Sequence, residues 1–218
     1  MQAAQRCLDP HPLGRYRLAA GYHVLLFDFR ATGESGGDAV SLGAYEVGDA
    51  LGALDYLGTR SEMDQRRIGL EGVSMGAAVA ILTAARDPRA IGVVAEAPFP
   101  DILSIIGTEY EHTVHLPAFP FAPVTIALAD LRLRTRIENI SPLREIGGLG
   151  QRPLLLMADG NDAQIPPPLQ QRLFEAATGP KQFWQIDGAT HAHGHTVQRV
   201  EYERRVLAFW KDAFAGVR

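Results

Sequence analysis

One pentapeptide constrains this chain more than any other feature: Gly72-Val73-Ser74-Met75-Gly76. An apolar, β-prone run at Ile68–Val73 precedes the serine, and a run of small and apolar residues typical of a helix, Ala77–Leu82, follows it. A strand, a sharp turn and a helix in this order are the setting in which a serine side chain is presented as a nucleophile. The alternative is an ordinary glycine-rich turn between a strand and a helix. The pattern therefore predicts Ser74 as a nucleophile at the carboxyl end of a buried strand.

The backbone N–H of the next residue, Met75, is expected to assist this serine. Met75 begins the helix that follows the turn, and the N–H groups of a first helical turn have no partner within the helix. Such a donor points to the place where negative charge forms on a substrate during acyl transfer. Met75 is thus the predicted backbone donor of an oxyanion hole.

The composition is that of a globular protein of one domain. A length of 218 residues is enough to bury a sizeable core, and the 46% of hydrophobic and 21% of charged residues are ordinary. A net charge of −4 gives no reason to expect nucleic acid or a membrane as a partner. The single Cys7 leaves no partner for an intramolecular disulfide. With no signal peptide after Met1, we expect a cytoplasmic protein, provided that Met1 is the native start, and leave a homo-oligomer open.

Apolar runs alternate with helical patterns along the chain, which predicts an α/β fold with a mostly parallel sheet flanked by helices. Five strands are expected, at His23–Phe29, Ile68–Val73, Ile91–Glu96, Pro153–Ala158 and Gln182–Ile186. Helices are expected over residues 16–20, 42–57 and 197–214 and directly after Ser74.

The stretch from Ala97 to Ile146 interrupts this alternation. It holds six prolines and three phenylalanines, and two helical pieces are expected within it, over residues 101–112 and 123–136. An apolar insertion after a sheet strand can serve as a lid over a pocket. It can equally be a packing excursion without a role in binding, and the sequence leaves both interpretations open.

A nucleophilic serine needs a base, and the base needs a carboxylate that orients it. The loop after the fourth expected strand contains Asp159 and Asp162, and the loop after the fifth contains His191. These residues therefore follow strand ends, as Ser74 does. Glu96 is a further acid at the end of the third expected strand, where it can tune the site or cap a turn.

From Gly21 to its C-terminus the chain resembles the α/β-hydrolase superfamily, and within it the bacterial proteins related to prolyl oligopeptidases and acyl esterases. The order Ser, Asp, His is the chain order of that superfamily. The matching pieces are Gly21–Arg30 with Gly33–Gly37, the Ser74 pentapeptide, Glu96–Phe99, Ser141–Leu143, the Asp162 loop and Gly188–His191.

The resemblance implies which acid and which histidine complete a triad. In the family an aliphatic residue and a proline follow the acid at the third and fourth positions, which fits Asp162 with Ile165 and Pro166; Asp159 is the alternative. His191 follows the Gly-Ala-x of the family's loop. Two further histidines, at positions 193 and 195, are expected in solvent or beside the site, and a metal site made of the three histidines is the rival interpretation.

The family's first three strands have no counterpart before Gly21. In the family the third strand lies between the strand of Asp28 and the strand of Ser74, so its absence leaves a gap of roughly 9–10 Å. Either the two neighbours close up, or another chain fills the gap, or this sequence is part of a longer protein. The loop that supplies the second oxyanion donor is missing too, and loss of one donor costs on the order of 10²–10³ in turnover.

These features together predict a serine hydrolase with an N-terminally truncated α/β-hydrolase fold. Its substrate is expected to be a small-molecule acyl ester, with an amide or peptide as the second choice, and no cofactor or metal is needed. The alternative is a truncated relative that binds a ligand or partner and does little or no chemistry.

Overall fold

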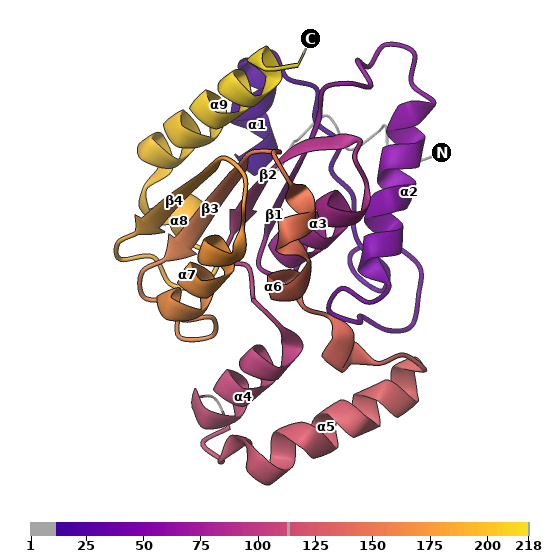
Figure 1. The fold of residues 1–218 in the computed structure, drawn as a ribbon, viewed down its shortest axis with the longest axis vertical. Helices are drawn as coiled ribbons and strands as arrows, with labels where there is room; N and C mark the ends of the chain where they lie inside the picture. Colours follow the sequence, from indigo (N-terminus) through magenta and orange to yellow (C-terminus); the bar gives the residue numbers. More distant parts are fainter. Residues whose placement is uncertain (1–11, 113, 218) are drawn as a thin grey trace.

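The computed structural model describes residues 12–112 and 114–217. Its sheet has four parallel strands, β1 (Ile68–Val73), β2 (Ala90–Glu96), β3 (Leu154–Asp159) and β4 (Lys181–Ile186), in the order β1-β2-β3-β4. Because all of them run in the same direction, their carboxyl ends meet at one edge of the sheet (Figure 1). The expected strands after the first are thereby confirmed within a residue or two.

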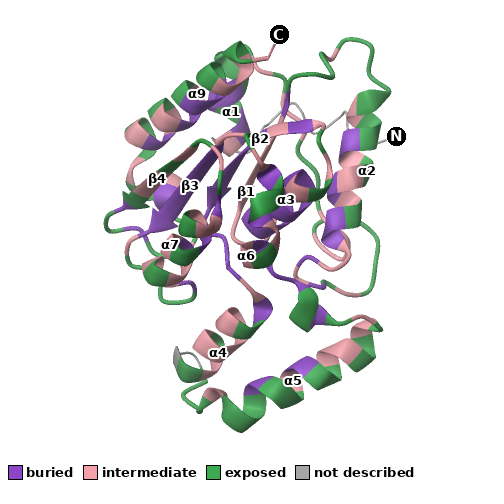
Figure 2. Cartoon of the chain, viewed as in Figure 1, coloured by how far each residue is buried: buried purple, intermediate pink, exposed green. Residues whose placement is uncertain are grey.

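Helices cover both faces of this sheet. One face packs against α3 (Met75–Arg86) and α7 (Pro167–Ala176), through Val93 and Leu156 among others. The other face packs against α9 (Arg199–Ala215), through Val94 and Leu155. Successive residues of a strand point to opposite faces, so the continuous apolar runs of β2 and β3 place a hydrophobic side chain against each layer. Figure 2 shows that the residues coloured as buried lie mainly in the strands and in the helices that pack against them.

Two helices flank the core at its edges. The helix α1 (Pro12–Ala19) lies beside α9, and α2 (Glu46–Gly58) packs against α3 (Figure 1). The expected helix over residues 42–57 therefore begins later, at Glu46. Residues 1–11, with Cys7 and most of the proline-rich start, lie outside the described residues. Within the described ranges, no helix has the length and apolarity to cross a membrane.

The insertion forms a helical pair that projects from the body of the molecule (Figure 1). It consists of α4 (Ile102–His112) and α5 (Ala118–Leu133), and the chain returns to β3 through α6 (Pro142–Glu145) and two short 3₁₀ turns, Ile137–Asn139 and Ile146–Leu149. Ile102 and Ile126 join one buried cluster with Val79 and Leu82 of α3. The pair is thus anchored to the body next to the helix that follows Ser74.

One expected strand is wrong. Residues His23–Phe29 run without secondary structure and pair with no strand among the described residues, so the sheet has four strands and not five. Their apolar side chains are poorly covered: Leu26 is 53% and Phe27 44% exposed. The apolar pattern of a strand is present, but a strand also needs a neighbour for its N–H and C=O groups. A cavity of about 640 Å³ lies between this segment and β1, so the two have not closed up.

Candidate active site

Ser74 lies on a sharp turn between β1 and α3. Its backbone angles are φ 53° and ψ −120°, which a residue with a side chain adopts only when its surroundings enforce it. The Ser74 N–H donates to the carbonyl of Glu96 in β2 at 2.8 Å, which fixes the turn to the sheet. A Cβ on Gly72 would collide with the backbone of Gly76, so the pentapeptide needs its first glycine for this close approach.

A continuous hydrogen-bonded chain joins the serine to a histidine and a carboxylate. The Oγ of Ser74 lies 2.7 Å from Nε2 of His191, and Nδ1 of His191 lies 2.7 Å from Oδ2 of Asp162. The side chain of Asp162 is fully buried, and its other oxygen accepts the backbone N–H groups of Gln164 and Ile165 at 2.9 and 2.8 Å. These bonds fix the carboxylate, so it accepts from Nδ1 and leaves Nε2 facing the hydroxyl.

The electrostatics of the site favour a strong base. The hydrogen bond that His191 donates to Asp162 raises the pKa of His191 above its ordinary value of 6.5; burial opposes the shift, and the negative charges of Asp162, Asp159 and Glu96 reinforce it. A base must be unprotonated to accept a proton from the serine hydroxyl. The arrangement therefore supports proton transfer above the raised pKa of His191.

Two buried acids hold the loop that carries His191. Oδ2 of Asp159 accepts the N–H of Ala192 at 2.7 Å, and Oε1 of Glu96 accepts the N–H of Gly194 at 2.9 Å. A Cβ on Gly194 would come within 2.8 Å of Glu96 Oε1 and 3.0 Å of Asp159 Oδ1, so these carboxylates closely surround the glycine. Asp159 is thus bound to the histidine loop and not to the histidine ring.

Glu96 has a partner that the sequence did not indicate. The hydroxyl of Tyr202, in α9, donates to Oε2 of Glu96 at 2.7 Å across 106 residues of sequence. Tyr202 lies in a helical stripe of core residues, and nothing in that stripe distinguishes a tyrosine with a buried acid partner from a simple core residue.

Burial, followed by the charge of Glu96, raises the pKa of Asp159 from 3.8 to about 7. The Oδ1 of Asp159 is buried and has no hydrogen-bond partner.

The two other histidines of this segment face elsewhere. His193 is exposed, and its Nδ1 lies 2.7 Å from the carbonyl oxygen of His191. His195, at the short helix α8 (Gly194–Val197), contacts Oε1 of Glu203 at 3.1 Å and stacks on Tyr16 with a centroid separation of 5.8 Å. Across residues 12–112 and 114–217, no group of three or more His, Cys, Asp or Glu side chains is arranged to hold a metal ion.

The expected oxyanion donor, Met75, is the first residue of α3. Its side chain packs against the cluster that contains Phe99 and Ile102, which joins the start of the projecting helical pair to the nucleophile turn. The oxyanion role of the Met75 N–H stays a prediction, as do the catalytic roles of Ser74 and its two partners.

The sequence profile of the prolyl oligopeptidase family matches residues 15–217, nearly the whole chain. The chain belongs to the prolyl oligopeptidase family. Among curated relatives in this comparison, the uncharacterised protein YqkD of Bacillus subtilis is 30% identical over 194 residues, which cover 88% of this chain and 63% of YqkD. The uncharacterised protein Rv2307c of Mycobacterium tuberculosis is 32% identical over 171 residues, 78% of this chain and 53% of its own. This family member thus spans less than two thirds of either relative.

Solved structures show that this member of the prolyl oligopeptidase family has the α/β-hydrolase fold. The Pyrococcus furiosus esterase Pf2001 superposes with a TM-score of 0.74 at 27% identity, over 92% of this chain and 75% of the esterase. An acylaminoacyl peptidase of Pyrococcus horikoshii superposes with a TM-score of 0.61 at 15% identity, over 81% of this chain and 28% of the peptidase. At 15% identity, the likeness to the peptidase shows a shared fold and nothing more.

Proposed function

We propose that this member of the prolyl oligopeptidase family is a serine hydrolase that cleaves a carboxylic ester through an acyl-enzyme. The observation that carries the proposal is the unbroken chain of hydrogen bonds from the Ser74 hydroxyl through His191 to Asp162, each at 2.7 Å. Such a chain is the arrangement that makes a serine nucleophilic. The reaction proposed for these three residues uses no cofactor.

In the first half of the reaction, Ser74 Oγ attacks the acyl carbon of the substrate while Nε2 of His191 takes the hydroxyl proton. Asp162 holds the imidazole in the reacting tautomer and stabilises the cation that forms. The tetrahedral intermediate then collapses: the bond to the leaving alkoxide breaks, and His191 returns its proton to that oxygen. The products of this half are an alcohol and an acyl group on Ser74.

In the second half, water attacks the acyl carbon and His191 takes a proton from it. Collapse of the second intermediate breaks the bond to Ser74 Oγ, to which His191 returns the proton, and a carboxylic acid leaves. In both halves the negative oxygen faces the N–H of Met75 at the start of α3. For the 218 residues by themselves, with the Met75 N–H as the one oxyanion donor that the sequence predicts, we expect turnover lower by on the order of 10²–10³ than with a complete oxyanion hole.

An ester is the preferred substrate class, with an amide or peptide as the second choice. The 27%-identical structural neighbour, Pf2001, is an esterase, whereas the Pyrococcus horikoshii peptidase shares only 15% identity. An ester also has a better leaving group than an amide, so it makes the smaller demand on an incomplete oxyanion hole. The helical pair α4–α5, packed beside Met75, would form a wall of the acyl pocket. A cytoplasmic location and a homo-oligomer stay predictions.

A second candidate is a binding protein that does little or no chemistry. The observation that favours it is the incomplete sheet, in which the segment before β1 pairs with no strand in the described part. A fluorophosphonate probe, which reacts with activated serines, separates the two candidates. We expect labelling of the protein and hydrolysis of short-chain p-nitrophenyl esters, both lost in Ser74→Ala.

The matched control is Ser35→Ala. Ser35 also lies in a glycine-rich turn, but its Oγ donates to the carbonyl of Asp28 at 2.7 Å and not to a histidine. We expect this variant to label and to hydrolyse esters like the parent protein. A folded protein that never labels, at any pH from 6 to 9, supports the binding protein and contradicts the hydrolase.

A further inference from the structure

Glu96, the last residue of β2, is bonded both to the turn of Ser74 and to the loop of His191. Its backbone carbonyl accepts the N–H of Ser74 at 2.8 Å, and its side-chain Oε1 accepts the N–H of Gly194 at 2.9 Å. Gly194 lies three residues after His191, in the loop that presents the imidazole. The distance from Ser74 Oγ to His191 Nε2 therefore depends on where this glutamate is held.

The histidine loop needs such a bond because its backbone is strained. Ala192, directly after His191, has a φ of 63°, in the left-handed region that a residue with a Cβ seldom adopts. A backbone of this kind persists only where its surroundings hold it. Here the N–H of Ala192 is held by Asp159 and that of Gly194 by Glu96. Without these two bonds the loop would relax, and the imidazole would move with it.

The Glu96 side chain is fixed in turn by helix α9. The hydroxyl of Tyr202 donates to Oε2 of Glu96 at 2.7 Å, and both side chains are buried, so water does not compete for this bond. Each oxygen of the carboxyl group thus accepts one hydrogen bond, Oε1 from the loop and Oε2 from the helix. Two bonds on different oxygens fix both the position and the orientation of the group.

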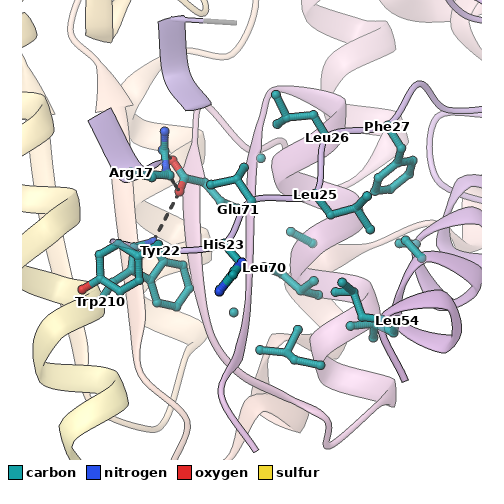
Figure 3. A pocket seen from close by; sticks show the side chains of 18 of the residues that line it. Arg17, Tyr22, His23, Leu25, Leu26, Phe27, Leu54, Leu70, Glu71 and Trp210 are labelled. Carbon is teal, nitrogen blue, oxygen red and sulfur yellow. Dashed lines mark hydrogen bonds and ion pairs between the residues drawn. The ribbon is translucent and has the colours of Figure 1, made fainter. Parts of the chain in front are cut away.

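Helix α9 is a firm support for this hydroxyl. Tyr202 belongs to the buried cluster between α9 and the sheet, and so does Trp210, about two turns further along the helix. The Nε1 of Trp210 donates to Oε2 of Glu71 in β1 at 3.3 Å, and Arg17 of α1 forms an ion pair with the same glutamate (Figure 3). The helix is thus bonded to β1 at one point and, through Tyr202, to β2 at another.

We propose that Glu96 and Tyr202 are positioning residues of the proposed hydrolysis, which hold the loop of His191 at the distance where Nε2 can take the proton of Ser74. The inference rests on the proposed function, because it concerns the rate at which Ser74 reacts through His191. The two side chains bond to the loop and to each other, so they act on the imidazole through the backbone of Gly194.

Three variants separate position from charge. Glu96→Ala removes the bond to Gly194, and we expect kcat for a p-nitrophenyl ester to fall by on the order of 10², the loss that a misplacement of about 1 Å produces. Tyr202→Phe removes one of the two bonds that fix the carboxyl group, and we expect a fall of about tenfold. Glu96→Gln keeps an acceptor for the N–H of Gly194 and a group that can donate to the Tyr202 oxygen, so we expect it to recover most of the rate. KM is expected to change by less than about twofold in all three, because the change is in the geometry of the base and not in the binding of the ester.

The pH profile gives a second readout. The charge of Glu96 acts with those of Asp162 and Asp159 to raise the pKa of His191. Glu96→Ala and Glu96→Gln both remove that charge, so we expect the acidic limb of the kcat/KM profile to move to lower pH in both, although only Glu96→Ala is slow. In Tyr202→Phe the charge stays, and the limb is expected not to move down. A role in stability alone would leave kcat as in the parent protein, at a temperature where circular dichroism shows every variant to be folded.

Two control variants make the same chemical changes elsewhere. Glu46→Ala removes another fully buried carboxylate, whose hydrogen bonds from Ser41 and Gly43 lie outside the triad. Tyr16→Phe removes another buried tyrosine hydroxyl of the cluster beside α9, one without a hydrogen-bond partner among the described residues. We expect both controls to keep the kcat of the parent protein.

A kcat like that of the parent in Glu96→Ala and Tyr202→Phe overturns the proposal, as does an equal loss of kcat in the two controls. So does a Glu96→Gln variant that is no faster than Glu96→Ala, because the bond to Gly194 would then not set the rate. If Glu96→Ala does not fold, Tyr202→Phe decides by itself, since it removes a single oxygen. In each of these cases Ser74 of the parent protein still reacts with the fluorophosphonate, whereas failure of the proposed function removes labelling from the parent itself.

Discussion

Asp159→Asn tests the buried acids behind the histidine loop. Burial, with the charge of Glu96 as the second cause, raises the pKa of Asp159 from 3.8 to about 7 in the folded protein. The folded state therefore holds the Asp159 proton more tightly than the unfolded chain does. The stability that this proton contributes is fully present below pH 3.8 and is lost as the pH rises through about 7.

The size of the effect follows from the shift. About three pKa units correspond to about 4 kcal/mol at most, of which roughly 2–3 kcal/mol is lost between pH 5 and pH 8. Asparagine carries no charge at any pH and keeps an acceptor for the N–H of Ala192. We therefore expect the unfolding free energy of Asp159→Asn to fall less steeply over this range, by about that amount.

The assay is urea unfolding at pH 5, 6, 7 and 8, followed by tryptophan fluorescence and far-ultraviolet circular dichroism. Asp187→Asn is the matched control, because Asp187 is an exposed acid at the start of the same loop. The raised pKa of His191 also makes stability fall as the pH rises. Because the charge of Asp159 is one of the smaller causes of that shift, Asp159→Asn flattens this slope as well, in the same direction. A constant difference between parent and Asp159→Asn from pH 5 to pH 8 refutes the reasoning.

Three further predictions concern the turn, the triad and a loop. Asp162→Asn lowers kcat by on the order of 10⁴ and shifts the acidic limb of the kcat/KM profile to lower pH, since the partner that raises the pKa of His191 is gone. Gly72→Ala pushes the turn apart, abolishes labelling by the fluorophosphonate and lowers the free energy of unfolding in urea by about 1–3 kcal/mol. Gly52→Ala, at a glycine with open space around it, keeps the labelling. Glu46→Gln weakens three hydrogen bonds that the fully buried carboxylate accepts from Ser41 and Gly43, and lowers the free energy of unfolding at pH 7 by roughly 1–3 kcal/mol, measured in urea.

The inner strands could be predicted because their uninterrupted apolar sequences indicate burial on both faces of the sheet. Residues 154–158 are apolar without interruption, and the structure buries every residue of β3. The run His23–Phe29 is almost as apolar, yet it forms no strand, because pairing depends on a neighbour that local sequence does not report. The resemblance to a known family did indicate that the neighbour was missing, and the cavity beside β1 lies where it would be.

In the candidate site, too, the sequence predicted some contacts and gave no sign of others. The pentapeptide and the two loops at strand ends are local signals, and the resemblance to the family singled out Asp162 and His191 within those loops. The structure brings the side chains of Ser74, His191 and Asp162 into contact. The contacts of Glu96 with Gly194 and Tyr202 span about a hundred residues and leave no local trace. Residues at the ends of parallel strands meet at one edge of the sheet, so their proximity can be predicted from the strand order. The position of a helix residue such as Tyr202 depends on how the helix packs on the sheet, which the local sequence does not show.

The central claim is tested most directly by the site of covalent labelling. The protein is treated with a fluorophosphonate and digested, and the modified peptide is sequenced by mass spectrometry. The account predicts one adduct, on Ser74, formed faster as the pH rises through the raised pKa of His191 and slowed strongly in His191→Ala. An adduct on another residue, or a Ser74 adduct whose rate does not change when His191 is replaced, would contradict it.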